Sequence, residues 1–446
     1  MKPHKSVFLF PSSFFHLVIA FLMLLNLGCK KAPTEPNTTA TLSVEDISCT
    51  EAWVKITTAN YQTPNTLTLF VNDKADQNIT LVSSDTLLYI DSLLPNQSYK
   101  IKAAFAANNQ LQTTNEVIAK TMDTTSHNFT WQTFAFGEQG SSTLYDVAII
   151  DENNIWAVGE IYMNDSLGKP DPNAYNAAHW DGQKWELKRI YTFSSCNPVD
   201  YAPLKAIWAF SDTNIVVTSG GSIGWYNGKT NKPDCSIRSL LTGAINKMWG
   251  TSSSDLYAVG NGGNIAHYDG KSWQKIESGT TLNINDIWGD FNQRTQKWEI
   301  LTVASNFLTG LEKEILQIIN NIVTKIPTSA QMWPLKTVWF VPNKQYYVAG
   351  SGIYQKRSLT DYLWKNEALD ITTFSTYSLR GNDVNDVIGV GAYGDVVHFN
   401  GVSWKNDYTD PVFNNQPYLA SVSIKNNLVV TVGIENRQAV LIKGKR

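Results

Sequence analysis

Four aspartates fall at or beside short apolar runs that recur along the chain from residue 144 onward. Pairs of carboxyl groups hydrolyse glycosidic bonds when one donates a proton and the other acts as base or nucleophile. If loops from several runs meet around one axis, these aspartates are the acids that a carbohydrate-active hydrolase would use. We keep that hydrolase as an alternative hypothesis, and its candidate acids are Asp146, Asp286, Asp290 and Asp386.

Three histidines occupy equivalent places, each before an aromatic residue and an Asp-Gly or Asn-Gly pair: His179, His267 and His398. Histidines from different repeats can converge on a metal ion. Each of these three, however, lies next to an outer hairpin, which would hold the imidazoles apart. No phosphate-binding loop, Ser-His-Asp signature or zinc motif occurs either. We therefore expect structural histidines, no catalytic residues, no cofactor and no metal.

Four cysteines are too few for a disulfide-rich scaffold. Cys196 and Cys235 lie in expected loops, and they form a possible disulfide. The sequence leaves this pairing open, because it does not give the separation of the two Cα atoms. If they pair, Cys49 is an unpaired and buried thiol.

Length and composition bound the elements that must position these residues. The chain has 446 residues, enough for two or three domains, and 43% of them are apolar, enough for a large core. Aromatic residues make up 12%, which favours packed β-structure. The net charge of −3 argues against a general nucleic-acid partner.

The first 28 residues have the pattern of a secretory signal, with Lys2 and Lys5 before the apolar run 14–27. Gly28 precedes Cys29, which resembles the bacterial lipoprotein signal and implies lipidation of Cys29. The leucine usually found three residues before the cysteine stands one place early, at Leu25. An uncleaved anchor or simple secretion stays open. Residues 29–40 are predicted to be a tether, and the expected location is the cell envelope, lipid-anchored to the outer membrane.

Residues 41–124 show short alternating runs about ten residues apart, which predict a small β-sandwich. The segment 93–99 (LLPNQSY) resembles the fibronectin type III pattern in which a tyrosine forms a corner. Trp53 departs from that family, because it precedes Val54 and Ile56 rather than following their strand. The resemblance implies a spacer or weak adhesion module.

A unit of four short β runs repeats over residues 129–446. Its clearest copy is 245–276, and equivalent positions near 147, 207, 248, 287, 338, 379 and 421 are mostly about 40 residues apart. Seven four-stranded units predict a seven-bladed β-propeller. The fold class is thus all-β: a fibronectin type III-like sandwich, then the propeller. Trp208, Trp249, Trp288 and Trp339 are expected to pack between blades, with stacking on sugars as the alternative.

The last repeat stops at Arg446 after three runs, and an unpaired run, 129–134, precedes the first repeat. We therefore expect this N-terminal strand to complete the last blade and close the ring. Residues 311–326 fit an amphipathic helix as well as a hairpin with a turn at Asn320-Asn321. We predict the hairpin, because the fourth repeat otherwise lacks its outer strands.

The repeat resembles bacterial secreted propellers of the sialidase-like and photosystem-assembly-factor-like kind, and its 248–273 stretch is typical of lipoproteins of Bacteroidota-type bacteria. A sialidase site would need three convergent arginines and a Tyr–Glu pair. We reject it, because the arginines share no repeat position; they are Arg189, Arg238, Arg294, Arg357, Arg380, Arg437 and Arg446.

Our leading hypothesis is a monomeric, membrane-anchored lipoprotein that binds an unknown protein or glycan and catalyses nothing. Irregular loops carry function more often than regular strands do. The candidate binding loops are the insertions 160–176 and 197–203. The alternatives are the hydrolase described above and an assembly factor for an envelope complex.

Overall fold

The computed structural model describes most of the chain after the tether. The predicted signal segment, the proposed lipidation site Cys29 and nearly all of the tether lie outside the described residues. Within the described part, no helix is long and apolar enough to cross a membrane. The described residues are 38–446 without 62, 108–109, 195, 307–309, 330–331 and 368–370.

The chain divides into two compact units. One contains residues 38–45, 53–89 and 99–119, and the other contains 46–52, 90–98 and 120–446. The strands of the N-terminal part form two antiparallel sheets, of order β1-β2-β5 and β4-β3-β6-β7, with β8 paired to β6. These strands are β1 (Thr39–Ile47), β2 (Ala52–Ala59), β3 (Asn65–Val71), β4 (Lys74–Leu81), β5 (Asp85–Ile90), β6 (Ser98–Ala107), β7 (Gln110–Thr113) and β8 (Val117–Lys120).

Alternate residues of these strands are buried, as expected for sheets that cover a core with one face. Leu67 and Leu69 on β3 are buried, and so are Val54 and Ile56 on β2. Trp53 is buried too, although it lies on the opposite face of β2, where its ring centroid is 5.7 Å from that of Tyr89.

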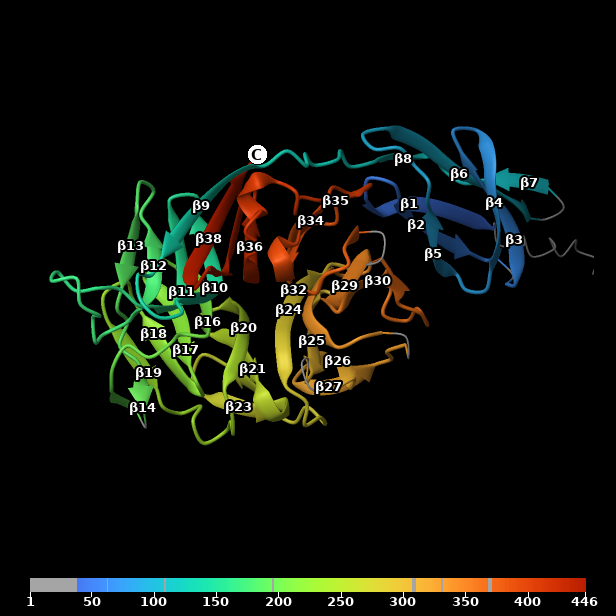
Figure 1. The fold of residues 1–446 in the computed structure, drawn as a ribbon. Helices are drawn as coiled ribbons and strands as arrows, with labels where there is room; N and C mark the ends of the chain where they lie inside the picture. Colours follow the sequence, from blue (N-terminus) through green and yellow to red (C-terminus); the bar gives the residue numbers. More distant parts are fainter. Residues whose placement is uncertain are drawn as a thin grey trace, which may run out of the picture. The chain divides into compact units, whose positions relative to one another are not determined.

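Residues 130–445 form seven four-stranded antiparallel sheets in the described structure, numbered here in chain order (Figure 1). The first four consist of β10 (Thr143–Asp151), β11 (Asn154–Ile161), β12 (Tyr175–Trp180) and β13 (Trp185–Lys188); β16 (Ala206–Ser211), β17 (Asn214–Ser219), β18 (Ser222–Tyr226) and β19 (Asn231–Asp234); β20 (Ile245–Ser252), β21 (Asp255–Gly260), β22 (Ile265–Tyr268) and β23 (Trp273–Ile276); β24 (Ile284–Asn292), β25 (Lys297–Ser305), β26 (Lys313–Ile319) and β27 (Ile322–Ile326).

The other three sheets complete the series. They consist of β28 (Leu335–Val341), β29 (Gln345–Gly350), β30 (Gly352–Lys356) and β31 (Lys365–Asn366); β32 (Thr376–Asp383), β33 (Asp386–Gly391), β34 (Val396–Phe399) and β35 (Trp404–Asn406); β36 (Tyr418–Lys425), β37 (Leu428–Glu435), β38 (Gln438–Lys445) and β9 (Thr130–Phe136). A two-stranded hairpin, β14 (Phe193–Ser194) and β15 (Asn197–Pro198), and three one-turn 3-10 segments, η1 (Asn261–Gly263), η2 (Ala392–Gly394) and η3 (Pro411–Phe413), lie between sheet strands.

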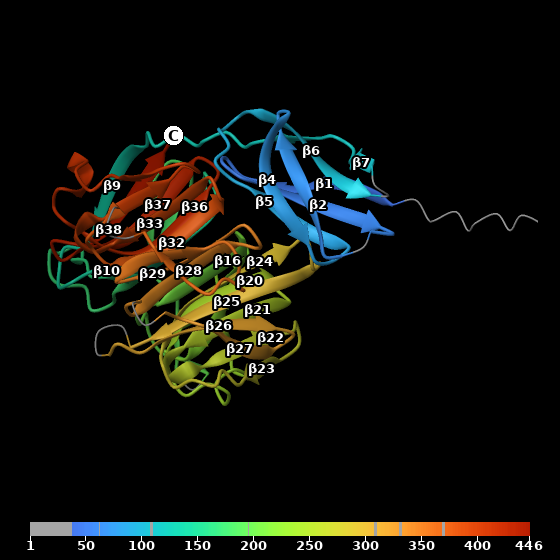
Figure 2. The same cartoon turned by 90° about the vertical axis from the view of Figure 1, so that its right-hand side faces the viewer.

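The first strand of each sheet contacts the first strand of the next, from β10 through β16, β20, β24, β28 and β32 to β36. The last of these, β36, contacts β10 again. As predicted, β9 pairs antiparallel with β38, with Thr130 opposite Lys445 and Phe136 opposite Ala439 (Figure 2). The predicted hairpin is also confirmed: β26 and β27 are joined at Asn320 and Asn321, which both have positive φ.

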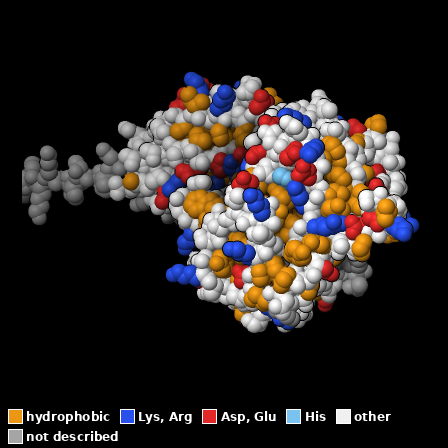
Figure 3. Space-filling model, turned by 90° about the vertical axis from the view of Figure 1, so that its left-hand side faces the viewer, with side chains coloured by type: hydrophobic (Ala, Val, Ile, Leu, Met, Phe, Trp, Pro, Cys, Tyr) orange, Lys and Arg blue, Asp and Glu red, His pale blue; other side chains and the backbone are white. Residues whose placement is uncertain are grey.

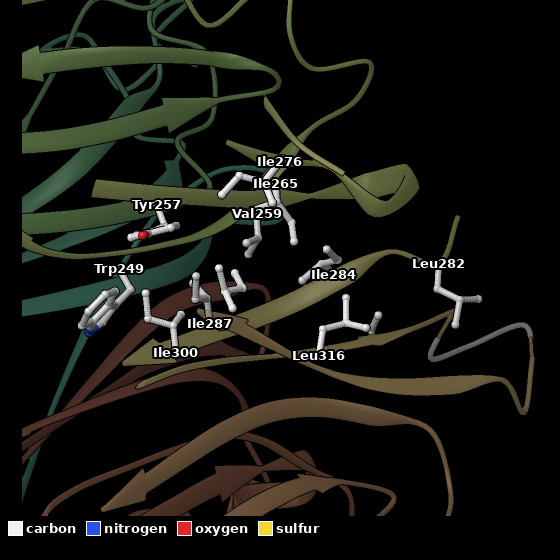
Figure 4. Packing of buried hydrophobic residues seen from close by; sticks show 12 residues of the cluster. Trp249, Tyr257, Val259, Ile265, Ile276, Leu282, Ile284, Ile287, Ile300 and Leu316 are labelled. Atoms are coloured by element: carbon white, nitrogen blue, oxygen red, sulfur yellow. The ribbon is translucent and has the colours of Figure 1, made fainter. Parts of the chain in front are cut away.

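Apolar side chains fill the space between neighbouring sheets. Between the third and fourth sheets, Val259 and Ile265 face Ile284 and Ile287 (Figure 4). All four are fully buried, so the sheets are held face to face by hydrophobic packing.

A glycine lies at or near the end of the second strand in five sheets, for a steric reason. Each glycine faces the start of the first strand of its own sheet. A Cβ atom on the glycine would lie between 1.8 and 2.2 Å from a backbone carbonyl oxygen there, that of the residue just before the first buried residue of the strand. No side chain fits such a space, which explains the recurring Val-Gly and Ala-Gly pairs of the sequence. The five are Gly159, Gly260, Gly350, Gly391 and Gly433.

Directly after this close approach, the first strand carries a β-bulge. In the fifth sheet, Leu335 pairs with Gly350 and Thr337 pairs with Ala349, so Lys336 is the extra residue. A bulge re-aims the side chain of the residue that it displaces. Six of the seven sheets show this bulge, at Tyr145, Asn246, Asn285, Lys336, Tyr377 and Ala420.

Candidate binding face

Strand direction assigns every connection of the seven sheets to one of two faces. Because the strands alternate in direction, the links between sheets lie at the same end as the loops between second and third strands. We call this end the loop face; it includes the segments 162–174, 189–205, 235–244, 392–395 and 407–417. The hairpins between first and second strands lie at the other end, the hairpin face.

Both predicted insertions lie on the loop face, where the side-chain amide of Asn176 donates to the Ala202 carbonyl at 3.0 Å. Arg189 pairs with Asp171 of the 160–176 insertion and donates to the Asn173 carbonyl at 2.7 Å. Its guanidinium lies 3.9 Å from the ring centroid of Tyr175 and 5.9 Å from that of Tyr201. Such cation–π contacts order an otherwise irregular loop pair.

Cys196 and Cys235 are joined by a disulfide, with Cα atoms 5.7 Å apart. The two residues belong to successive links between sheets, so the bond connects neighbouring segments of the loop face. Cys49 is a free, buried cysteine of the described residues, and burial raises the pKa of its thiol to about 11.

Aromatic side chains are frequent on this face. Tyr191 and Tyr201 lie 4.7 Å apart between ring centroids, and Tyr377 and Tyr418 lie at the same separation. Tyr191, Tyr393, Tyr408 and Tyr418 are among the exposed large side chains. Rigid aromatic rings at half-exposed positions suit recognition of a partner surface.

On one side of the molecule, shown in Figure 3, lysines and arginines are interspersed with aspartates and glutamates, and hydrophobic side chains form patches between them. A groove of about 680 Å³ opens on the loop face between the third and fourth sheets. Its walls are polar and carry both charges, from residues that include Lys275, Glu277, Glu312 and Lys313.

A Tyr–Glu pair does occur on the loop face. The hydroxyls of Tyr145 and Tyr162 both donate to the carboxylate of Glu160. Burial and the hydrogen bond to Glu160 raise the pKa of Tyr145, which is the opposite of what activates a tyrosine nucleophile. The arginines of a sialidase site are not assembled here, because Arg380 and Arg446 are engaged with Asp286 and Asp386.

Inside the ring of first strands, a repeated hydrogen bond connects neighbouring sheets. Positions are counted from the first buried residue at or near the start of each first strand, for example Leu144 in the first sheet. A side-chain oxygen at the third position of one first strand accepts a hydrogen bond from the backbone N–H at the fourth position of the first strand in the following sheet. These pairs are Asp146 with Ile207 at 3.1 Å, Asp286 with Val338 at 3.1 Å, Thr337 with Leu379 at 3.0 Å and Ser378 with Val422 at 3.2 Å.

Asp146 is buried and serves as the centre of one half of this network. Its carboxylate accepts from the Val147 N–H at 3.0 Å and from the Ser421 hydroxyl at 2.8 Å. It also pairs with Lys247 of the third sheet. The candidate acid Asp146 is therefore engaged in holding sheets one, two, three and seven together.

Asp286 is the centre of the other half of this hydrogen-bond network. It accepts from the Thr337 hydroxyl at 2.7 Å and forms a two-point ion pair with Arg380 of the sixth sheet. Burial favours the neutral acid, but the charge and hydrogen bonds of Arg380 outweigh it and lower the pKa of Asp286. A carboxylate so held is a poor proton donor at neutral pH.

The other two candidate acids lie apart from this network. Asp386 is buried, bonded to His398 at 3.1 Å and paired with the C-terminal Arg446. Asp290 stands opposite Glu299 in the β24–β25 register, and burial raises the pKa of Asp290 to about 6. Glu299 is buried and bonded to Asn292, whereas Asp290 is half-buried.

Each of the three histidines stacks on or bonds to neighbouring side chains. His179 stacks on Trp156 and bonds to Asn154 at 3.1 Å, while His267 stacks on Tyr257 and pairs with Asp255 at 2.7 Å. His398 is buried against Asp386. Among residues 38–446 that the structure describes, no three metal-ligating side chains of His, Cys, Asp or Glu come together.

Packing is confirmed for two of the four tryptophans. Trp249 and Trp339 are buried, and a Cβ atom on Gly289 or Gly381 of the next sheet would lie within 2.6 Å of their rings. Trp208 and Trp288 are half-buried and meet each other, 6.5 Å apart between ring centroids. The sequence did not predict that a cation covers Trp288. Arg380 occupies, in the sixth sheet, the position that tryptophan occupies in four other sheets. Its guanidinium lies 5.1 Å from the ring centroid of Trp288.

Comparison with known proteins identifies the type of fold. No protein-family profile matches the sequence, and no curated protein matches it. Among solved structures, YCF48 bound to D1 peptide is similar, with a TM-score of 0.52 and 15% identity over 71% of this chain and 95% of that one. YCF48 from Cyanidioschyzon merolae gives a TM-score of 0.49 and 13% identity over 70% and 98%. The chain therefore has an all-β, propeller-like fold.

Proposed function

We propose that this chain is a lipid-anchored protein of the cell envelope whose loop face binds a protein partner without catalysing a reaction. Its N-terminal sandwich is a fibronectin type III-like spacer, and its C-terminal part is a seven-bladed β-propeller. The anchor is a diacylated Cys29 at the start of the tether 29–40.

The ring of contacts supports seven blades. The seven four-stranded sheets follow one another through their first strands, and the β36–β10 contact joins the last to the first. The pairing of β9 with β38 gives the seventh sheet its fourth strand and leaves no unfinished sheet.

The strand orders support a fibronectin type III-like sandwich. That fold packs a sheet of three strands on a sheet of four; here β1-β2-β5 form a three-stranded sheet, and the second sheet has the order β4-β3-β6-β7 with β8 added beside β6. Such modules seldom carry chemistry, so a spacer is the role that we assign.

One observation carries the binding function: Asp146 and Asp286 are buried in bonds that connect the sheets, while the loop face presents exposed aromatic side chains. The acids that catalysis would need are thus committed to structure. A protein is favoured over a glycan, because the similar YCF48 structure holds a peptide.

Site-specific photocrosslinking in native envelopes tests this proposal. A benzoylphenylalanine replaces Tyr393 on the loop face, or Trp298 on the hairpin face as a matched exposed control. We expect Tyr393 and Tyr191 positions to capture the same protein, identified by mass spectrometry, and the Trp298 position to capture none of it. Equal capture from both faces, or none from the loop face, would contradict the proposal.

The alternatives and the anchor have their own readouts. Turnover of glycans that is lost in Asp290→Asn would establish the hydrolase, and capture of several subunits of one envelope complex would establish the assembly factor.

Cys29→Ser should release the protein from the membrane fraction and abolish labelling by a fatty-acid probe. Continued labelling of that variant would refute lipidation of Cys29.

A further inference from the structure

The bulged residues of the first strands surround the loop-face end of the ring, and all six are half-buried. Most of them have partners. Tyr145 bonds to Glu160, while the side-chain amides of Asn246 and Asn285 donate to the carbonyls of Ile284 and Leu335 at 2.9 Å. The side chain of Lys336 has no hydrogen bond or ion pair with the described residues, although it is half-buried like the others.

The charge of Asp286 attracts the Lys336 ammonium, and the charge of Lys247 repels it. Asp286 has no capacity left for a further donor. One of its oxygens accepts from the Ile287 N–H and from Arg380, and the other accepts from Thr337, Val338 and Arg380. Lys336 thus lies close to a carboxylate that is already satisfied.

Among the charged groups Asp146, Lys247, Asp286, Lys336 and Arg380, the positive charges outnumber the negative charges by one. Lys247 neutralises Asp146, and Arg380 neutralises Asp286, which leaves the charge of Lys336 in excess. A partly buried ammonium without an anion costs free energy. Burial accordingly lowers the pKa of Lys336 below its ordinary value.

We propose that Lys336 is the anchor of an anion site at the loop-face mouth of the ring, and that it takes a carboxylate carried by a peptide segment of the partner. This inference rests on the proposed protein-binding function and names the chemistry of the bound segment. Tyr377, the bulged residue of the adjacent sixth sheet, provides apolar ring surface for the residues beside that carboxylate.

Thermal unfolding of the full chain, purified in detergent, tests the site. The probe is an N-acetylated tetraglutamate peptide, compared with the amidated tetraglutamine peptide and with sodium acetate. A ligand at ten times its Kd should raise the unfolding midpoint by about 2–4 °C. We expect this shift in the native chain and in Lys336→Arg, and its loss in Lys336→Met. Lys271→Met, which removes an exposed lysine from the turn between β22 and β23, should respond as the native chain does.

An equal shift in Lys336→Met, or with the tetraglutamine peptide, would overturn the anion site. Equal shifts by acetate and tetraglutamate at the same carboxylate concentration would overturn its assignment to a peptide. If Lys336→Met does not fold, acylation of Lys336 by an amine reagent replaces the variant, with mass spectrometry as the readout. Tetraglutamate should then slow modification of Lys336 but not of Lys271, and equal slowing of both would overturn the site.

Crosslinking separates this inference from the proposed function. If Lys336→Met captures the partner through position 393 as well as the native chain does, the anion site is wrong while the binding function stands. If the native chain captures no partner, the binding function is wrong whatever the peptides do.

Discussion

Arg380 and Asp286 form a two-point ion pair between sheets that are not neighbours. Nη1 of Arg380 lies 2.9 Å from Oδ2 of Asp286, and Nη2 lies 2.7 Å from Oδ1. Thr337 of the sheet between them donates to the same carboxylate. The bond therefore connects three successive sheets through one buried group.

Removal of one partner should destabilise the protein strongly. Arg380→Met leaves Asp286 charged and buried, and we expect a loss of about 3–5 kcal/mol in the free energy of unfolding. The double variant Arg380→Met/Asp286→Asn should lose less than the two single variants together. Urea denaturation measures these values, with the exposed Arg238→Met as a control that changes stability by less than about 0.5 kcal/mol. Additive losses would show that the two residues are not coupled.

The steric role of the strand-end glycines gives a second prediction. Gly391→Ala places a methyl group 1.9 Å from the Ser375 carbonyl oxygen, and backbone must move to admit it. We expect a loss of about 1–3 kcal/mol in the free energy of unfolding. The fourth sheet has Ala304 opposite Ile284 at the equivalent position, so Ala304→Gly is the matched control and should cost about 1 kcal/mol or less. A stable Gly391→Ala protein would contradict this account of the motif.

From the raised pKa of Asp290 we predict that the stability of the protein depends on pH. Its pKa is about 6 in the folded chain, mainly through burial, against 3.8 without that environment. The folded state therefore holds the proton more tightly, and this group destabilises the protein as pH rises from about 4 to 6. Asp290→Asn should raise the free energy of unfolding by about 2–3 kcal/mol at pH 7 and have little effect at pH 4. Equal effects at both pH values would rule out a raised pKa.

The disulfide gives a fourth prediction. Cys196 and Cys235 are 39 residues apart, and a bond across such a loop stabilises a protein by about 2–4 kcal/mol. The variant Cys196→Ser/Cys235→Ser should unfold at a lower temperature than the native chain. Reductant should lower the midpoint of the native chain toward that of the variant and leave the variant unchanged. An unchanged native midpoint, with both thiols free by mass spectrometry, would exclude the bond.

Much of the fold could be predicted because its signals are local. The close approach in five of the sheets requires glycine, so Gly159 and Gly433 repeat visibly although they lie far apart in the chain. The turn at Asn320 and Asn321 likewise needs residues that tolerate positive φ. Such requirements are written into neighbouring residues, and periodicity exposes them.

The interior network could not be predicted in the same way. Lys247 and Asp146 are 101 residues apart, and Arg380 and Asp286 are 94 apart, on sheets that are not adjacent. Repeat alignment shows which positions are equivalent, but not which of them meet across a ring. One signal was present: polar residues at the third position of otherwise apolar first strands, as at Thr337.

For the same reason, the sequence could not show that the candidate acids Asp146 and Asp286 have structural roles. Asp146 and Asp286 lie inside the ring, as a hydrolase would need, yet the partners that engage them come from other repeats. Only the distances between side chains distinguish a catalytic carboxylate from a structural one.

The pairing of β9 with β38 has a consequence for biosynthesis. The ribosome makes β9 about 300 residues before it makes the strand that β9 must pair with. Until Lys445 has emerged, β9 has no partner and the seventh sheet is incomplete. A chain that ends before β38 thus keeps two exposed strand edges, which cellular proteases and chaperones can recognise.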